Sequence, residues 1–318
     1  ARVLLEAFVT ITLSFVVFTF GSLLVAIQVA SAQLTPRLIA TTLLRDRVVK
    51  YTVGLFIFTL MFALSAQNLM ENRVNQLVML LATLLGVFSL AAFFYLIDYA
   101  SRLLRPISLL AHVGAAGIAV TESVYPEIGH GTEIEEGGII DLGAPGRVIR
   151  HQGASAIVVA ADLEALRGQA ERSKGIIEFV PQIGDFVAID DPLFNLYGGA
   201  CSVDARKLSS SVAFGSERVM DQDPTFAFRI VVDVALKALS PAINDPTTAV
   251  LAMDQLHRLL RGVGRRHLRT DELLDQSGKI RVIFRTPNWD DFVYLVFSEI
   301  RSCGSNNLQV VRRMRAMI

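Results

Sequence analysis

The segment Ser240–Thr248 holds the side chains best suited by type and spacing to bind a ligand. It offers amide, carboxylate and hydroxyl groups in close succession, on Asn244, Asp245, Thr247 and Thr248. A proline follows Asp245, and an Asp-Pro pair is a favoured helix start. Because free backbone NH groups at a helix start attract anions, one interpretation is a ligand, ion or gating site. The other interpretation is that Asp245 only caps the helix.

A second pair of aspartates, Asp221 and Asp223, stands in a similar turn ahead of the preceding expected helix. If that helix runs antiparallel to the next one, its two ends lie apart, so these aspartates need not approach Asp245. Arg218 and Arg229 are close enough in sequence to pair with the aspartates, which would give them a structural role. Asp221 and Asp223 are therefore candidates for the same ligand or gating site, with a structural alternative.

No catalytic motif accompanies these aspartates. The sequence has no GxSxG elbow, no P-loop and no HExxH motif. Its histidines show no metal-ligand spacing with the two cysteines, Cys201 and Cys303. His257 lies on an expected helix beside Arg258 and Arg261, which favours an exposed side chain. We therefore predict no enzyme activity, no cofactor and no metal site.

Composition separates the chain from soluble nucleic-acid-binding proteins. Lys plus Arg and Asp plus Glu both number 30, so the basic surplus of a nucleic-acid binder is absent. Hydrophobic residues make up 52% and charged residues 19%, and the latter share is below that of ordinary soluble domains. About 20 mostly apolar residues cross a bilayer as a helix. The long uncharged stretches predict transmembrane helices at about 5–30, 51–70 and 76–99.

Lys and Arg residues orient these helices. They gather in the 31–50 loop and again after residue 101, and the positive-inside rule places both regions in the cytoplasm. Residues 36–48 form an expected amphipathic helix at the inner membrane surface. Its arginines Arg37, Arg45 and Arg47 are candidate contacts for anionic headgroups. Packing of this helix on the cytoplasmic domain is the alternative.

The first expected span has a polar face. Thr10, Ser14, Gly21 and Gln28 fall within about 40° of one another at 100° per residue. Small and polar residues on one face favour close helix packing or the lining of a wet lumen. No expected span has a charged residue in its middle, which argues against a coupled transporter but is compatible with a channel lined by hydroxyls and amides.

The sequence predicts a membrane α-helical domain followed by a cytoplasmic α+β domain. Residues 1–105 are the transmembrane domain, and 106–145 are a connecting helix and a glycine-rich hinge. Closely spaced strand patterns at 146–200 indicate a small β-rich module, barrel-like or sandwich-like, whose IGDFVAIDDPLF stretch is similar to the turn region of lipoyl-type modules. Residues 201–318 are mainly helical. Since both ends of the chain are abrupt, we expect further sequence beyond them.

Three segments of the chain carry a resemblance to a known family. They are QVASAQLTPRLIATTLLRDR, FGSERVMDQDPTFAFRIVVDVALKA and ALSPAINDPTTAVLAMDQL. Together they resemble a bacterial family of predicted membrane proteins, domain of unknown function 2254. The resemblance covers the whole chain. It implies a bacterial inner-membrane protein with an additional N-terminal span and further C-terminal sequence, and it implies no established activity.

Two function classes fit these observations. The first is a homo-oligomeric, channel-like protein with a cytoplasmic regulatory domain. The second is a membrane-anchored cytoplasmic platform that binds a ligand or assembles with partners. Both imply contact with the lipid bilayer and a homo-oligomer, and both leave room for a small ion or an anionic ligand. A continuous polar face across the assembled spans would favour the first class.

Overall fold

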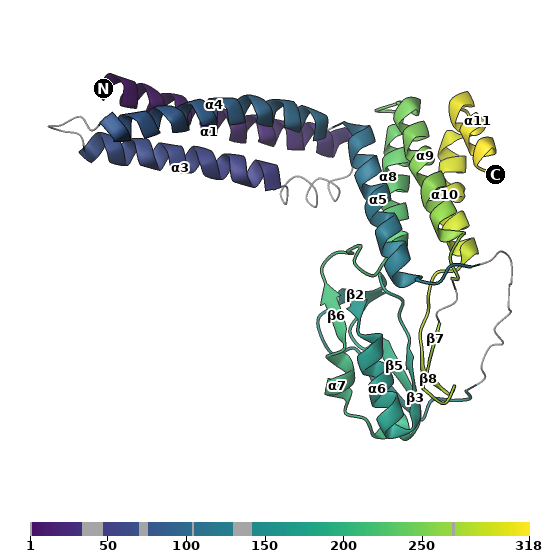
Figure 1. Ribbon diagram of the computed structural model, residues 1–318. Helices are drawn as coiled ribbons and strands as arrows, with labels where there is room; N and C mark the ends of the chain where they lie inside the picture. The colour runs from purple at the N-terminus through teal and green to yellow at the C-terminus, as the bar shows by residue number, and fades with distance from the viewer. Residues whose placement is uncertain (1, 34–46, 70–75, 104, 130–141, 269–270) are drawn as a thin grey trace. The chain divides into compact units, whose positions relative to one another are not determined.

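Figure 1 shows the computed structural model of the chain, which describes residues 2–33, 47–69, 76–103, 105–129, 142–268 and 271–318. The chain forms two compact units. One consists of Ala1–Leu110 together with Lys237–Thr248, and the other of Ala111–Leu236 with Ala249–Ile318. The first unit is helical, whereas the second combines two sheets with helices.

The first unit contains three long apolar helices: α1 (Arg2–Gln33), α3 (Arg47–Leu69) and α4 (Gln76–Leu103). Helices were predicted in all three places. Within α3 and α4, Arg47–Gln67 and Gln76–Tyr99 are long and apolar enough to cross a membrane, while the shorter apolar run Val9–Ser22 lies in α1.

A further candidate span lies after α4. Helix α5 (Pro106–Val124) is long and apolar enough to cross a membrane. The sequence led us to expect a helix leaving the membrane there. Its composition therefore makes α5 a third helix of membrane-spanning character.

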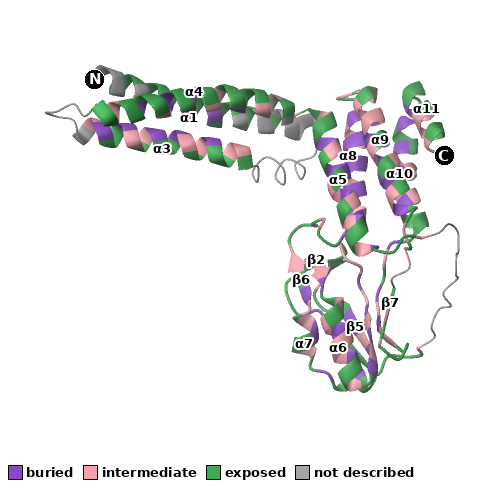
Figure 2. Ribbon diagram, in the orientation of Figure 1, coloured by how far each residue is buried: buried purple, intermediate pink, exposed green. Residues whose placement is uncertain are grey.

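The interior of the three-helix unit holds many small and hydroxyl-bearing side chains, together with the larger Phe56 and Leu96. Helices α3 and α4 meet there through Ala66, Ala82 and a buried hydrogen bond of 2.9 Å between the hydroxyls of Thr59 and Ser89. Other large apolar side chains, such as Phe58 and Phe88, are exposed. Figure 2 shows long exposed stretches along α4. Small residues and hydroxyls between helices with apolar residues outside are the arrangement that a lipid environment favours.

Within the described residues, the second unit has two sheets built from eight strands. These are β1 (Arg147–Arg150), β2 (Ala156–Ala161), β3 (Gly175–Phe179), β4 (Phe186–Val187), β5 (Pro192–Gly198), β6 (Val212–Gly215), β7 (Glu272–Leu274) and β8 (Ile280–Ile283). One sheet has the order β1-β5-β3-β8-β7, with β3 and β8 parallel, and the other the antiparallel order β4-β2-β6. Both sheets are open, so the predicted small barrel is not what these strands form.

The larger sheet takes strands from outside the predicted module. Periodicity at 146–200 identified β1 to β5, but β8 comes from about a hundred residues later and pairs with β3. Long-range pairing of this kind has no local signature. Helix α6 (Leu163–Ser173) begins at a capping aspartate, because the Asp162 side chain accepts a hydrogen bond from the Ala165 NH at 2.9 Å. Its Leu166 packs with Ile177 and Val282 in one core.

Short elements link the sheets, and helices complete the unit. The short elements are η1 (Gly199–Ser202) and α7 (Ala205–Ser209), and the helices are α8 (Pro224–Ala238), α9 (Pro246–Val263), α10 (Trp289–Gly304) and α11 (Leu308–Met317). Helix α5 approaches α8 and α9 closely at Gly117, where a Cβ atom would lie 2.7 Å from the Cβ of Ala227 and 2.9 Å from Leu259 Cδ2. A larger residue at Gly117 would force these helices apart.

Candidate functional site

The segment Ser240–Thr248 forms a capped helix start. Asp245 Oδ1 accepts a hydrogen bond from the Thr248 backbone NH at 3.1 Å, and Oδ2 accepts one from the Thr248 hydroxyl at 2.5 Å. The Thr248 hydrogen bonds hold the pKa of the Asp245 carboxyl below its ordinary value, although burial opposes this. Asn244 has a left-handed φ of 48°. Capping by Asp245 is confirmed, while a ligand or gating role for Asn244, Asp245, Thr247 and Thr248 stays a prediction.

Asp223, which belongs to the second unit, is buried and fully hydrogen-bonded. Its Oδ2 accepts two hydrogen bonds from Arg218, at 2.9 Å from Nε and 2.6 Å from Nη2, and its Oδ1 accepts one from the Phe226 NH. The expected pairing with Arg218 is therefore confirmed. Arg229 instead pairs with Asp233 and Glu299, so its expected pairing with Asp221 or Asp223 is not the one that forms.

Asp221 is exposed in the loop before α8. The neighbouring Gln222 accepts a hydrogen bond from the Ala161 NH at 3.0 Å, which ties this loop to β2. With Asp223 occupied by Arg218 and Asp221 directed into solvent, the two aspartates do not form a joint ligand cradle. A ligand role for either one stays a prediction.

The polar face predicted on the first span lies on the surface of the three-helix unit. Thr10, Ser14, Gly21 and Gln28 are all exposed. The hydroxyls of Thr10 and Ser14 donate to backbone carbonyls four residues earlier, at 2.9 and 2.8 Å. The face is therefore available to lipid or to a second copy of the chain, with two of its donors already occupied.

The proposed headgroup arginines are mostly beyond what the structure describes. Arg37 and Arg45 lie outside the described residues, as does nearly all of the expected amphipathic helix at 36–48. Arg47 is the exposed first residue of α3. Their contact with headgroups stays a prediction.

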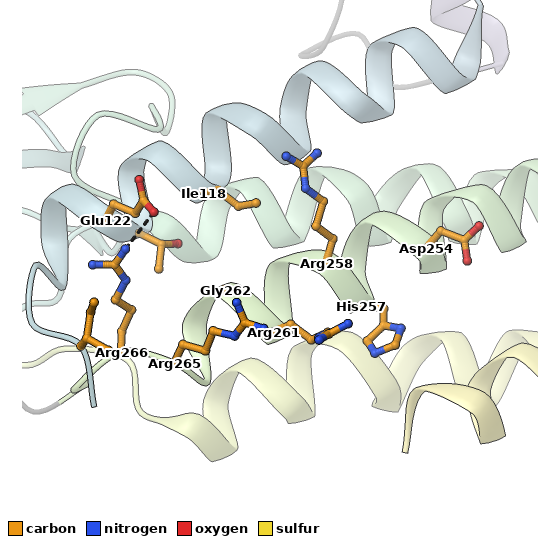
Figure 3. A pocket seen from close by; sticks show the side chains of 11 residues that line it. Ile118, Glu122, Asp254, His257, Arg258, Arg261, Gly262, Arg265 and Arg266 are labelled. Carbon is orange, nitrogen blue, oxygen red and sulfur yellow. Dashed lines mark hydrogen bonds and ion pairs between the residues drawn. The ribbon is translucent and has the colours of Figure 1, made fainter. Parts of the chain in front are cut away.

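A pocket of about 620 Å³ in the second unit was not predicted from the sequence. It lies between α5 and α9 (Figure 3). Its lining residues are Ile118, Thr121, Glu122, Ile128, Asp254, His257, Arg258, Arg261, Gly262, Arg265 and Arg266. Four arginines stand against two carboxylates in this lining, so the pocket is positively charged.

Backbone pairing at the end of α9 fixes one side of this pocket. The Gly129 NH donates to the Arg265 carbonyl at 3.0 Å, and the His267 NH donates to the Glu127 carbonyl at 2.9 Å. The Arg266 side chain donates to Glu122 Oε1 at 2.8 Å. These bonds attach the segment after α5 to the end of α9 and commit the charge of Arg266 to a carboxylate.

A second cluster of charges lies at the other end of the pocket. Arg313 of α11 donates to the Asp254 carboxylate and, at 3.0 Å, to Nδ1 of His257. Because a guanidinium has no acceptor, Nδ1 must be the unprotonated nitrogen of a neutral imidazole. Burial, followed by Arg313 and Arg261, lowers the pKa of His257, which supports the neutral form.

Arg258, Arg261 and Arg265 are the cations left over. In the described part of the chain, no hydrogen bond or ion pair joins their side chains to another residue. All three are exposed at the pocket, with Arg258 and Arg261 on α9 and Arg265 in the turn that follows it. Guanidinium groups without protein partners, arranged around a cavity, can bind an anion.

The sequence indicates one side of this pocket but not the other. Arg258 and Arg261 recur at helical spacing on α9, and Arg265 follows in the turn after it. His257 was correctly placed on a helix beside the first two, but it is half-buried and bonded to Arg313 and not exposed as expected. The opposite wall comes from α5, well over a hundred residues earlier, and Gly114 and Gly117 allow its approach. Sequence periodicity cannot identify which distant helix closes a cavity.

Comparison with known proteins places the chain among uncharacterized relatives. A family model described as predicted membrane protein (DUF2254) matches residues 1–318. Uncharacterized proteins of Mycobacterium bovis and Mycobacterium tuberculosis are each 26% identical over 314 residues, covering 94% of this chain and 59% of the relative. The chain thus spans less than two thirds of these relatives. No solved structure matches it.

Proposed function

We propose, from the premise that the chain belongs to the DUF2254 family of predicted membrane proteins, that it is a membrane-anchored protein whose α/β unit binds an anionic ligand. The observation that carries the proposal is the set of Arg258, Arg261 and Arg265 around the pocket, none of them paired within the described residues. The membrane helices anchor this ligand-binding platform. No reaction chemistry is assigned to it.

Competition between protein and ligand for the arginines supports this assignment. Arg266 and Arg313 are both held by carboxylates, as surface arginines often are, so they have little left to offer a ligand. Arg258, Arg261 and Arg265 can form charge-assisted hydrogen bonds with a ligand without breaking a bond within the described protein. An anion therefore gains contacts at no cost in existing ion pairs.

The test is anion binding by the detergent-solubilised protein, measured by isothermal titration calorimetry with inorganic phosphate, diphosphate and tripolyphosphate. Replacing Arg258, Arg261 and Arg265 together by Gln should abolish the binding heat for all three anions. The matched control replaces Arg172, Arg206 and Arg301, which are also exposed but lie outside the pocket, and removes the same net charge. If both triple variants lose the same binding heat, the anions bind through the net charge of the protein and not at the pocket.

Localisation and assembly form part of the same proposal. The protein resides in the bacterial inner membrane with its large C-terminal part in the cytoplasm, as the Lys and Arg bias of the loops supports. It assembles as a homo-oligomer. Reporter fusions after Ile318 that are active only in the periplasm would overturn the orientation, and a monomer by light scattering in detergent would overturn the assembly.

A homo-oligomeric channel is a second candidate function. It is favoured by the exposed polar face of α1, formed by Thr10, Ser14, Gly21 and Gln28, which could line a conduit when copies assemble around an axis. The pocket would then be the regulatory site of the cytoplasmic part. Flux of K⁺, Na⁺, Cl⁻ and Ca²⁺ from proteoliposomes tests this function against empty liposomes. Gln28→Leu should reduce flux, and absence of flux under every gradient and ligand tested would leave the platform alone.

A further inference from the structure

The three arginines left over at the pocket follow one another along its lining as a short row and do not converge on one point. Arg258 and Arg261 lie on one face of α9, and Arg265 follows in the turn after α9 ends at Val263. Figure 3 shows that Arg258 extends towards α5, whereas Arg261 extends towards His257. One small anion therefore cannot contact all three guanidinium groups together.

Carboxylates limit the positive charge at both ends of this row. Glu122 stands at one end, bound to Arg266, and Asp254 stands at the other, bound to Arg313. A polyanion much longer than the row would extend over these two ion pairs, whose charges already cancel, and would gain no further attraction there. The row therefore favours a ligand with several negative charges over a short length.

We propose that the pocket takes a ligand carrying two or more phosphate groups joined in a row, an inference that rests on the anion-binding function proposed above. A guanidinium matches the oxygen geometry of phosphate with two parallel hydrogen bonds. Successive phosphates present such oxygens one after another over a short length, and Arg258, Arg261 and Arg265 follow one another along the pocket lining. The volume of about 620 Å³ accommodates such a ligand, whereas a single phosphate would leave most of it unfilled.

The same phosphate chain can come from two sources. Ile118 and Ile128 add apolar surface to the lining, and α5, which supplies Ile118, is itself a candidate membrane span. A free oligophosphate and a membrane lipid with a diphosphate head would present the same groups to the arginines. The shared chemistry is the phosphate chain, and the experiment separates the two sources.

The experiment titrates the detergent-solubilised full chain with orthophosphate, diphosphate and tripolyphosphate at matched ionic strength. Citrate serves as a multiply charged anion without phosphate. We expect affinity to rise along the series, with tripolyphosphate at least about tenfold tighter than orthophosphate and than citrate, since each added phosphate engages a further guanidinium. The single variants Arg258→Gln and Arg265→Gln remove the ends of the row and should reduce the preference for tripolyphosphate more than the binding of orthophosphate. Arg301→Gln, outside the pocket, should change neither.

Each outcome decides a different point. Equal binding of orthophosphate and tripolyphosphate, lost in the triple Arg→Gln variant, would overturn the phosphate-chain inference and keep the anion site. No binding of any anion would overturn both proposals. Citrate as tight as tripolyphosphate would show that the pocket selects charge only, which also overturns the inference.

A second pair of titrations identifies the source. Phosphatidylcholine vesicles with a prenyl diphosphate are compared with vesicles with the corresponding monophosphate, using protein reconstituted in each. If fluorescence quenching or co-sedimentation of the protein with the vesicles requires both the diphosphate and Arg258, the ligand is a lipid head. Binding of free tripolyphosphate with no difference between the two vesicles assigns a soluble ligand. If neither binds, the inference fails.

Discussion

Two helices of the chain begin with the same three residues, Asp-Pro-Thr, and their aspartates have different surroundings. Both aspartates cap a helix through the NH three residues later. Asp223 is also buried and bonded to Arg218 through two hydrogen bonds, whereas Asp245 is half-buried and its side chain is bonded to Thr248. An identical local signal therefore specifies the helix start but not what the carboxylate does beyond it.

The neighbours of Asp223 explain the difference. Gly184, from the turn before β4, comes so close that a Cβ atom there would lie 2.5 Å from Asp223 Oδ2 and 2.8 Å from Arg218 Nη2. Arg218 also lies over the ring of Phe226, 5.3 Å from its centroid. Tertiary contacts thus make one of the two helix caps part of a buried hydrogen-bond network. Such a network stabilises the fold more than a single cap does.

The largest effect is expected for Asp223→Ala. The substitution removes the cap of α8 and leaves Arg218 without its carboxylate in a partly buried site, which should cost about 3 kcal/mol of the free energy of unfolding. Thermal and denaturant unfolding of the purified protein measure it. Asp221→Ala is the matched control, because Asp221 is exposed two residues earlier. If both variants lose the same stability, the network around Asp223 is no stronger than an ordinary loop.

A smaller effect is expected for Gly184→Ala. The residue has φ of 96° and the added Cβ would press on the Arg218–Asp223 pair, so we expect a loss of about 2 kcal/mol. Gly278 also has a positive φ, 79°, but has open space around it. Gly278→Ala therefore reports backbone strain alone. If Gly184→Ala loses more stability than Gly278→Ala, the excess measures the contact between the added Cβ and the Arg218–Asp223 pair. Equal losses would mean that this contact has no effect on stability.

Asp245→Ala should cost about 1 kcal/mol, the usual value for a helix cap. Asp245→Ser, which keeps a capping oxygen without the charge, should recover most of that loss. Ligand binding and ion flux, measured on the same variants, should be unchanged if Asp245 is only a cap. A lost response at unchanged thermal stability would restore the ligand or gating role predicted for this segment.

The two Asp-Pro-Thr starts also show which features of the fold the sequence predicts. The starts of α6, α8 and α9 were predictable, because aspartate capping and proline at the first helical position are local properties. The partner of Asp223 was predictable from a nearby arginine, but its burial under Gly184 was not. Two of the pocket arginines, Arg258 and Arg261, were visible in the sequence on the expected helix, while Arg265 lies in the turn beyond its end. The parallel pairing of β3 with β8 and the wall of the pocket from α5 join distant segments, and periodicity carries no signal for them.

The smallest effect, and the one that tests the surroundings of Asp245 most directly, is the pH dependence of Thr248→Val. Hydrogen bonds from Thr248 lower the pKa of Asp245 in the folded protein, so the charged carboxylate stabilises the folded state. That stability is present above the unfolded pKa near 3.8 and is lost as pH falls through the lower folded pKa. Removing the hydroxyl raises the folded pKa towards the ordinary value. Near pH 7 the variant should be less stable by about 0.5 kcal/mol, the low end for a hydrogen bond. Well below the folded pKa, where Asp245 is protonated in both proteins, the difference should shrink.

The measurement is unfolding of both proteins between pH 2 and 7. Asp223, which caps α8 and also binds Arg218, supplies the contrast. Thr225→Val removes a hydroxyl that donates to Asp223 Oδ1 at 2.6 Å, while the two hydrogen bonds from Arg218 to Asp223 remain. Equal losses of stability at pH 7 in the two variants would mean that the two hydroxyls contribute alike despite the different neighbours of the two aspartates. A difference between wild type and Thr248→Val that stays constant down to pH 2 would mean that the Thr248 hydroxyl does not act through the charge of Asp245.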